Sequence, residues 1–115
     1  MDIILKKRKN CLVVRLAGEL DDHMAARLRR ELKETLKEYP SFSLLLNMEG
    51  LSFIDSSGVG VILGRYREMT REKRDIMLCG LGSQVKRVLD LAGVLKIVPC
   101  FGSEEEALNQ GRSCR

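Results

Sequence analysis

The chain has 115 residues, of which 44% are hydrophobic and 31% are charged, a balance typical of one soluble globular domain and not of a disordered or fibrous chain. It contains no tryptophan and a single histidine, which excludes a histidine-rich metal site and leaves any catalytic triad dependent on His23. The formal net charge of +4 comes mostly from one cationic cluster near the N-terminus. The rest of the chain is nearly neutral, which does not favour a nucleic-acid-binding surface.

The cationic cluster follows a short apolar segment at the start of the chain. Its members are Lys6, Lys7, Arg8 and Lys9. We interpret them as part of a charged edge strand, because cations on a sheet edge discourage pairing with other chains, in preference to a patch for nucleic acid or anionic lipid. Residues 3–5 and 12–16, on either side of the cluster, are predicted to form an extended pair.

The four cysteines are widely separated, and none has the C-x-x-C spacing of a zinc or dithiol site. Cys11 and Cys79 lie within apolar runs and are predicted to be small buried residues of a protein from a reducing compartment, whereas Cys114 is predicted to be an exposed thiol. No signal sequence or membrane span is recognisable. We therefore expect a cytoplasmic protein with no cofactor and no direct contact with membranes or nucleic acid.

The chain then alternates between helical and extended patterns. An amphipathic helix is predicted over residues 22–39, where apolar side chains recur at helical spacing, and Pro40 ends it. The near-continuous apolar run over residues 42–48 predicts a central strand covered on both faces. A second helix is predicted over residues 57–70.

Shorter elements complete the pattern. They are a strand over residues 76–79, a helix over 83–92, an edge strand over 96–100 and a short helix opened by a capping box of Ser103 and Glu106. The order ββαβαβαβα predicts a single α/β domain over residues 1–115, with a mixed, mostly parallel sheet and packed helices.

The most informative segment is Leu51-Ser52-Phe53-Ile54-Asp55-Ser56-Ser57-Gly58-Val59-Gly60, where an apolar strand end meets the start of a helix. A phosphate on Ser56 would lie beside backbone N–H groups that have no partner within the helix, and the helix dipole would favour its charge. The domain could therefore carry this modification while folded. Gly58 and Gly60 lack side chains, which would let the active site of another protein approach the backbone closely.

The same segment has two other interpretations. Asp55, Ser56 and Ser57 could supply only an N-cap for the helix, which is the commoner use of such a tetrapeptide. Ser56 could also be the nucleophile of a small hydrolase with Asp55 and His23 as helpers. The G-x-S-x-G elbow is absent, however, and His23 lies in a charged segment at another helix start. We predict no catalytic residue.

A second informative segment is the turn Gly18-Glu19-Leu20-Asp21-Asp22, which carries three carboxylates between the second strand and the first helix. Asp21 or Asp22 is expected to be the N-cap of that helix. The other carboxylates could contact an arginine of a partner. No metal site is predicted, since the spacing of an EF-hand is missing.

Four segments carry a family pattern. They are the turn at residues 18–21, the junction at residues 51–58, the continuation Val59-Gly60-Val61-Ile62-Leu63-Gly64-Arg65-Tyr66 and the later Val85-Lys86-Arg87. Together they resemble the STAS domains of bacterial anti-sigma factor antagonists, above all those of sporulation, over residues 3–110. The resemblance implies that the unphosphorylated protein binds an anti-sigma factor that is also a serine kinase and so releases a sigma factor. It implies further that the kinase inactivates the protein by phosphorylating Ser56 and that a phosphatase restores it.

The resemblance also implies which residues face the kinase. They are Glu19, Asp21, Asp55, Ser57, Gly58, Val59 and Gly60, with Asp55 orienting the Ser56 hydroxyl. The chain departs from the family pattern in its cations at residues 6–9 and in Asp22 before His23, both of which could tune the choice of partner.

Two alternatives stay open beside this one. The first is a STAS domain of another partner-switching circuit, such as a general stress response, or a scaffold subunit of a larger sensory complex. The likeness around residues 51–66 favours sporulation. The second is an adaptor whose basic N-terminal segment binds a membrane or nucleic acid.

Overall fold

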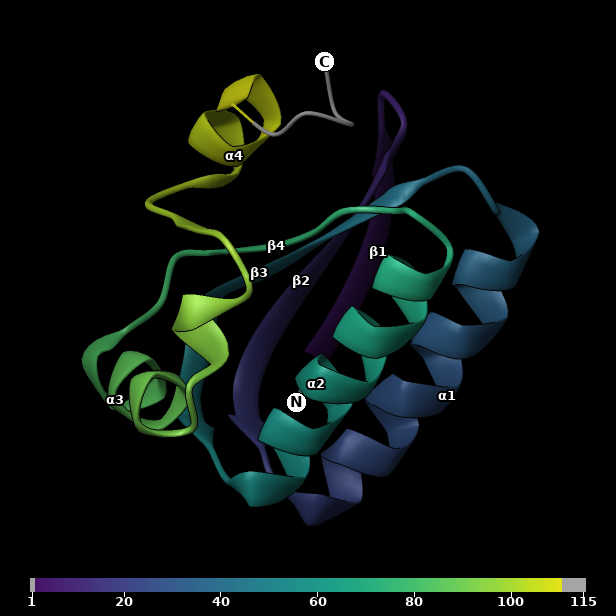
Figure 1. Ribbon diagram of the computed structural model, residues 1–115. Coiled ribbons are helices and arrows are strands. Elements are labelled where there is room, and N and C mark those ends of the chain that lie inside the picture. Colours follow the sequence, from purple (N-terminus) through teal and green to yellow (C-terminus); the bar gives the residue numbers. More distant parts are fainter. Residues whose placement is uncertain (1, 111–115) are drawn as a thin grey trace.

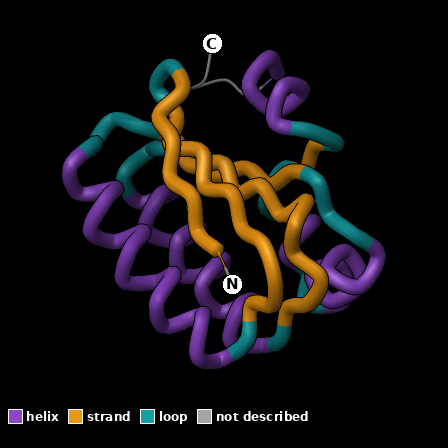
Figure 2. Tube along the Cα trace, turned by 180° about the vertical axis from the view of Figure 1, so that it is seen from behind, coloured by secondary structure: helices purple, strands orange, loops and turns teal. Residues whose placement is uncertain are grey.

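The computed structural model describes residues 2–110 (Figures 1 and 2). The elements in chain order are β1 (Asp2–Arg8), β2 (Cys11–Leu20), α1 (Asp22–Glu38), β3 (Ser43–Ile54), α2 (Ser56–Arg71), β4 (Ile76–Cys79), α3 (Ser83–Leu91), the 3-10 turn η1 (Val94–Lys96), β5 (Cys100–Phe101) and α4 (Glu104–Gln110). The five strands lie in the order β1-β2-β3-β4-β5. β1 is antiparallel to β2, and the other neighbours are parallel. The predicted α/β fold and element order are confirmed.

The sheet has an apolar layer on each face because side chains alternate along its strands. Leu44, Leu46 and Met48 of β3 belong to the larger core, which α1, α2 and α3 cover, whereas Leu45 belongs to a smaller cluster beneath α4. Figure 1 shows α1 and α2 side by side across one face of the sheet. The prediction that the central strand is covered on both faces is confirmed.

β1 is an edge strand, as expected from its charges. It pairs with β2 alone, and Lys6, Lys7 and Arg8 are exposed. Lys9 follows in the tight turn to β2 with a left-handed backbone, at a φ of 55°.

Two strands differ from the prediction. β3 continues to Ile54 instead of ending near residue 48, because its pairing with β2 persists through two register shifts although Glu49 and Gly50 interrupt the apolar run. The prediction of a strand over residues 96–100 is wrong. Lys96 is the last residue of η1, and the last strand is the two-residue β5.

The reason for the short last strand is local. Pro99 has no N–H to donate to β4. Before it, the N–H of Val98 donates to the carbonyl of Val94 at 2.9 Å, and both valines are buried. The segment is therefore a helical turn that fills the core, and the backbone becomes extended only after it.

A buried arginine closes the C-terminal end of α1. Arg74 Nη1 donates to the carbonyls of Tyr39 at 2.9 Å, Phe42 at 3.2 Å and Leu36 at 3.4 Å. The Arg74 side chain is only 7% exposed, and it pairs with Glu72. It thereby joins the last turn and the C-cap of α1 to the segment that leads into β3. No helix within residues 2–110 has the length and apolar character needed to cross a membrane.

Candidate functional site

The two segments singled out in the sequence meet at one edge of the sheet. β2 and β3 are parallel, so their carboxyl ends lie together, with Leu20 opposite Ile54. The N–H of Asp55 donates to the carbonyl of Leu20 at 3.4 Å. As a result α1 and α2 start beside each other, at the lower end of both helices in Figure 1.

An aspartate caps each of these helices. Asp21 Oδ1 accepts from the N–H of Met24 at 3.0 Å, which confirms Asp21 as an N-cap. Asp55 Oδ1 accepts from the N–H groups of Ser57 at 2.9 Å and Gly58 at 3.3 Å. The capping interpretation of the junction is therefore correct for Asp55. The Ser56 side chain makes no capping hydrogen bond.

A side-chain hydrogen bond joins the two helix starts. Ser57 Oγ donates to Asp22 Oδ1 at 3.1 Å. A second bond, from Ser52 Oγ to the carbonyl of Gly18 at 3.1 Å, links the same two segments. The contact between Asp22 and Ser57 was not predicted, because nothing local in the sequence places these two side chains opposite each other.

Ser56 differs from its neighbours. It is the first residue of α2 and is exposed. Among residues 2–110 its hydroxyl makes no hydrogen bond, whereas the Ser57 hydroxyl is held by Asp22. An enzyme that approaches this edge therefore meets a Ser56 hydroxyl that no described residue holds. The start of α2 around it is fixed by Asp55, which caps the helix, and by Asp22, which bonds to Ser57.

The three residues after Ser57 have different surroundings. Gly58 is buried, and a Cβ added to it would lie 2.6 Å from Ile54 Cγ1 and 2.9 Å from Leu20 Cγ. The expectation that its missing side chain makes room for a partner is therefore wrong: internal packing requires glycine here. Val59 is also buried, at 8% exposure within the core. Gly60 is exposed with open space around it, as expected.

Gln84 of α3 supports the same edge, and sequence reasoning missed it. Its side-chain oxygen accepts from the N–H of Ile54 at 3.2 Å, and its Nε2 donates to the carbonyl of Ile54 at 3.3 Å. This amide fixes the end of β3 directly before Asp55. A glutamine in the first turn of a helix carries no signal by which the sequence could have revealed this contact.

A second polar cluster lies on the other face of the sheet, beneath α4. Glu104 accepts from Arg15 at 2.6 and 2.9 Å, from Asn47 Nδ2 at 2.6 Å and from Arg8 at 3.4 Å. The hydrogen bond from Arg15 is the main reason that the pKa of Glu104 falls to about 2. Nearby, burial raises the pKa of Cys79 to about 12. Cys79 and Cys11 are both buried, as predicted, and Cys114 lies outside the described residues.

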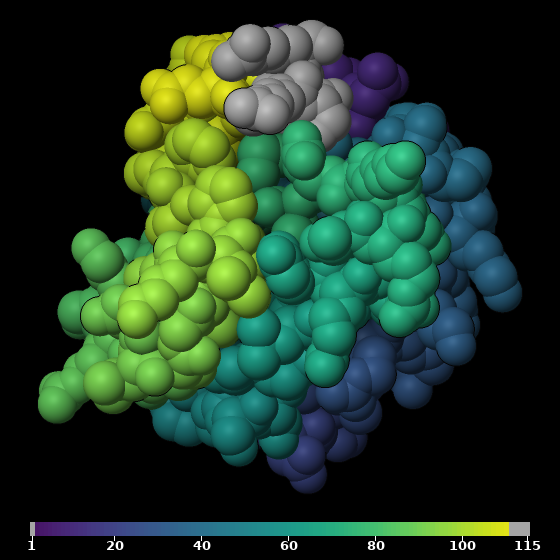
Figure 3. Space-filling view, in the orientation of Figure 1, coloured from purple at the N-terminus to yellow at the C-terminus, as the bar shows by residue number. Residues whose placement is uncertain are grey.

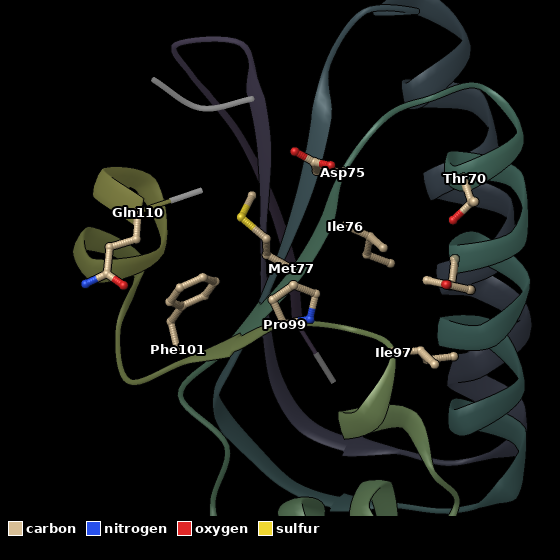
Figure 4. Close-up of a pocket in the computed structure, with 9 residues that line it drawn as sticks. Thr70, Asp75, Ile76, Met77, Ile97, Pro99, Phe101 and Gln110 are labelled. Carbon is tan, nitrogen blue, oxygen red and sulfur yellow. The ribbon is translucent and has the colours of Figure 1, made fainter. Parts of the chain in front are cut away.

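A groove of about 430 Å³ opens at the other end of α2. Figure 4 shows Thr70 of α2 on one side, Phe101 and Gln110 on the other, and Ile76 and Met77 of β4 between them. With a rise of 1.5 Å per residue, Thr70 lies about 21 Å along the helix from Ser56. The groove is therefore separate from the edge that carries the serine.

The model of the STAS domain family matches residues 2–107. The chain belongs to the STAS domain family. It is 34% identical over 110 residues to the anti-sigma F factor antagonist of Paenibacillus polymyxa, a match that covers 96% of this chain and 94% of the relative. The resemblance inferred from the four sequence segments is thus confirmed at the level of the family.

Solved structures agree with this STAS assignment. The anti-sigma factor antagonist SpoIIAA in its unphosphorylated form is 32% identical, with a TM-score of 0.83 and 96% coverage of both chains. The Bacillus cell fate determinant SpoIIAA in its phosphorylated form is 30% identical, with a TM-score of 0.77, over 96% of this chain and all of that chain. Both forms of SpoIIAA share the fold of this STAS domain.

Proposed function

We propose that this STAS domain is an anti-sigma factor antagonist of a sporulation circuit, switched off by phosphorylation of Ser56. Unphosphorylated, it binds an anti-sigma factor that is a serine kinase and so releases the sigma factor. The observation that carries the proposal is the exposed Ser56 hydroxyl, free of hydrogen bonds among the described residues, at the edge where two helices start. The relatives named as anti-sigma F factor antagonists support the choice of circuit.

The carboxylates around Ser56 give the kinase a surface to recognise. Glu19 and Asp22 are exposed, and Asp21 is partly exposed. No ion pair within residues 2–110 involves any of these three carboxylates. An arginine of the partner can therefore bind here with charge-assisted, bidentate hydrogen bonds. Ser57 and Gly60 complete the accessible part of the proposed interface, while Gly58 and Val59 support it from below.

The switch follows from charge. The kinase transfers the γ-phosphoryl group of ATP to Ser56 Oγ, which adds up to about −2 charge. In the docked complex that charge is desolvated beside Asp55 and Asp22. An uncompensated charge in an interface costs about 2–5 kcal/mol, which corresponds to a loss of affinity of about 30-fold to several thousand-fold. The helix start itself tolerates the phosphate, because its dipole favours negative charge.

Phosphorylation is not expected to unfold the domain. Ser56 is exposed, and the capping bonds are made by Asp55. The phosphorylated and unphosphorylated forms of SpoIIAA both have this fold, which supports the same behaviour here. A phosphatase then removes the phosphate and returns the cytoplasmic protein to its binding form, so that the chain is a substrate and regulator with no cofactor of its own.

The deciding experiment is intact-mass measurement after incubation with a purified anti-sigma F kinase and ATP. Wild type is expected to gain one phosphoryl group, Ser56→Ala none, and Ser57→Ala one. A gain in Ser56→Ala but not in Ser57→Ala would move the site to Ser57. No gain in any form, with the kinase active on its own antagonist, would contradict the proposed circuit.

A further inference from the structure

Five arginines each form an ion pair with a carboxylate, but three others that gather in one place form none within residues 2–110. Arg8, Arg15, Arg27, Arg71 and Arg74 each form an ion pair with a glutamate. Arg29, Arg65 and Arg67 form none within residues 2–110. These three side chains line the same hollow between α1 and α2, so their charges are left uncompensated at one point of the surface.

The hollow has a volume of about 290 Å³. Its lining comprises Arg29 of α1 together with Val61, Gly64, Arg65, Arg67, Glu68 and Arg71 of α2. Glu68 is the one acid among these described residues, and it already pairs with Arg71 at 2.9 Å. Gly64 adds no side chain to the hollow, and a Cβ placed there would meet nothing within 4 Å. We call this site the arginine hollow.

One rim of the arginine hollow, formed by Gly64, Arg67 and Arg71, lies on the same side of α2 as Ser56. Ser56, Gly60, Gly64, Arg67 and Arg71 follow each other at intervals of three or four residues, which places them on one side of the helix. A rise of 1.5 Å per residue puts Arg71 about 22 Å from Ser56. Gly60 and Gly64 add no side chains to this side of α2. Figure 3 shows the outer faces of α1 and α2 side by side.

The chemistry of the arginine hollow selects its ligand. Guanidinium groups bind carboxylates through paired hydrogen bonds, and several unpaired ones together favour a ligand with more than one negative group. None of the residues that line the hollow carries an aromatic ring that could stack on a nucleotide base. Its size suits one or two acidic side chains and not a large ligand.

We propose that the arginine hollow is a second contact for the anti-sigma kinase, which places an acidic segment in it while its active site reaches Ser56. This inference rests on the proposed function. A partner seated over Ser56 and lying along the glycines of α2 would reach Arg67 and Arg71 without crossing a raised side chain. The hollow then adds affinity and a faster encounter, and both effects weaken with salt.

The test compares two variants with the same change of net charge. The hollow variant carries Arg29→Gln and Arg67→Gln, and the control variant carries Arg30→Gln and Lys33→Gln, which are exposed on α1 outside the hollow. Binding of the purified kinase is measured at about 0.05 M and about 0.5 M salt. We expect the hollow variant to bind about tenfold more weakly at low salt, with the difference shrinking at high salt, and the control variant to stay within about twofold of wild type.

Equal affinity of the hollow and control variants, while wild type binds and is phosphorylated on Ser56, would overturn this inference and leave the proposed function intact. If wild type does not bind the kinase, the proposed function fails, and a hexaglutamate peptide tests the hollow alone. Amide NMR shifts confined to Gly64, Arg65 and Arg67, and lost in the hollow variant, would support an acidic ligand. The absence of these shifts in wild type, or equal shifts in the hollow and control variants, would overturn it.

Discussion

Two polar clusters of this STAS domain differ in how their carboxylates are used. Beneath α4, a single carboxylate, Glu104, takes up hydrogen bonds from Arg15, Asn47 and Arg8. At the serine edge, formed by Asp21, Asp22, Asp55, Ser56 and Ser57, the carboxylates bind backbone N–H groups and a hydroxyl but no cation within residues 2–110.

The cluster beneath α4 stabilises the fold, whereas the serine edge is available to a partner. Glu104 is saturated by cationic and amide donors from β1, β2 and β3, so it holds α4 on the sheet and has little capacity for an outside ligand. The serine edge keeps its negative charge exposed on a rigid frame, which is what a partner with a cationic side chain requires. Single substitutions in each cluster can break this contrast.

The largest effect is expected from a charge on Ser56. Ser56→Asp should weaken kinase binding about 30-fold or more, because the added carboxylate is desolvated beside Asp55 on docking. The melting temperature should stay nearly unchanged. Ser83→Asp is the matched control, since Ser83 is also the exposed first residue of a helix, and it should bind like wild type. Isothermal titration with the kinase measures both, and equal affinity of Ser56→Asp and wild type would refute the switch.

The next largest effect is expected on stability, at Gly58, which is packed beneath the start of α2. Gly58→Ala should lower the free energy of unfolding by about 1–3 kcal/mol, because its Cβ overlaps Ile54 and Leu20. Gly60→Ala, two residues further along the same helix, meets open space and should raise stability by up to about 1 kcal/mol. Urea denaturation gives both values. Equal changes at the two sites would show that packing does not distinguish them.

A smaller effect is expected at Glu104. Its pKa lies at about 2, below the ordinary value of 4.5, so its ionised form is stabilised by folding. That stability is present above about pH 5 and is lost as the pH falls towards 2. Glu104→Gln should therefore cost about 1–2 kcal/mol near neutral pH and almost nothing once the pH has fallen to about 2.

The exposed neighbour Glu105 supplies the control for this pH dependence. Glu105→Gln should change the free energy of unfolding by less than about 0.5 kcal/mol at every pH. Urea denaturation of wild type and both variants across the acid range measures the difference. A cost of Glu104→Gln that does not depend on pH would show that the lost interaction is not the ion pair.

The smallest effect is expected at Asp21. Asp21→Asn keeps a good N-cap and removes the charge. It should leave the melting temperature nearly unchanged and weaken kinase binding about threefold to tenfold, as the loss of one partly exposed charge at an interface does. Surface plasmon resonance at low salt measures it. Unchanged affinity would remove Asp21 from the proposed interface.

Local patterns predicted much of this molecule. The helical spacing of residues 22–39 and Pro40 gave α1 to within one residue, and the apolar run at residues 76–79 matched β4. Asp21, one of the two expected candidates, is the N-cap. These features depend on neighbours within one helical turn or one strand, and the sequence displays those neighbours directly.

Contacts between distant segments were not predictable in the same way. Asp22 and Ser57 are 35 residues apart, Arg15 and Glu104 are 89 apart, and Gln84 reaches Ile54 across 30 residues. Each depends on strand register and on how a helix is set against the sheet. The burial of Gly58 has the same origin, since the side chain of Leu20 blocks it only after β2 and β3 are aligned.

The sequence by itself determined the α/β class, the order of the elements and the position of Ser56 at a helix start, because periodicity and capping residues act over a few residues. The tertiary structure alone decided which serine is free, which glycine is there for packing and where uncompensated arginines gather. Those properties belong to pairs of segments that parallel strands bring together, and a pattern read along one chain does not specify the distance between them.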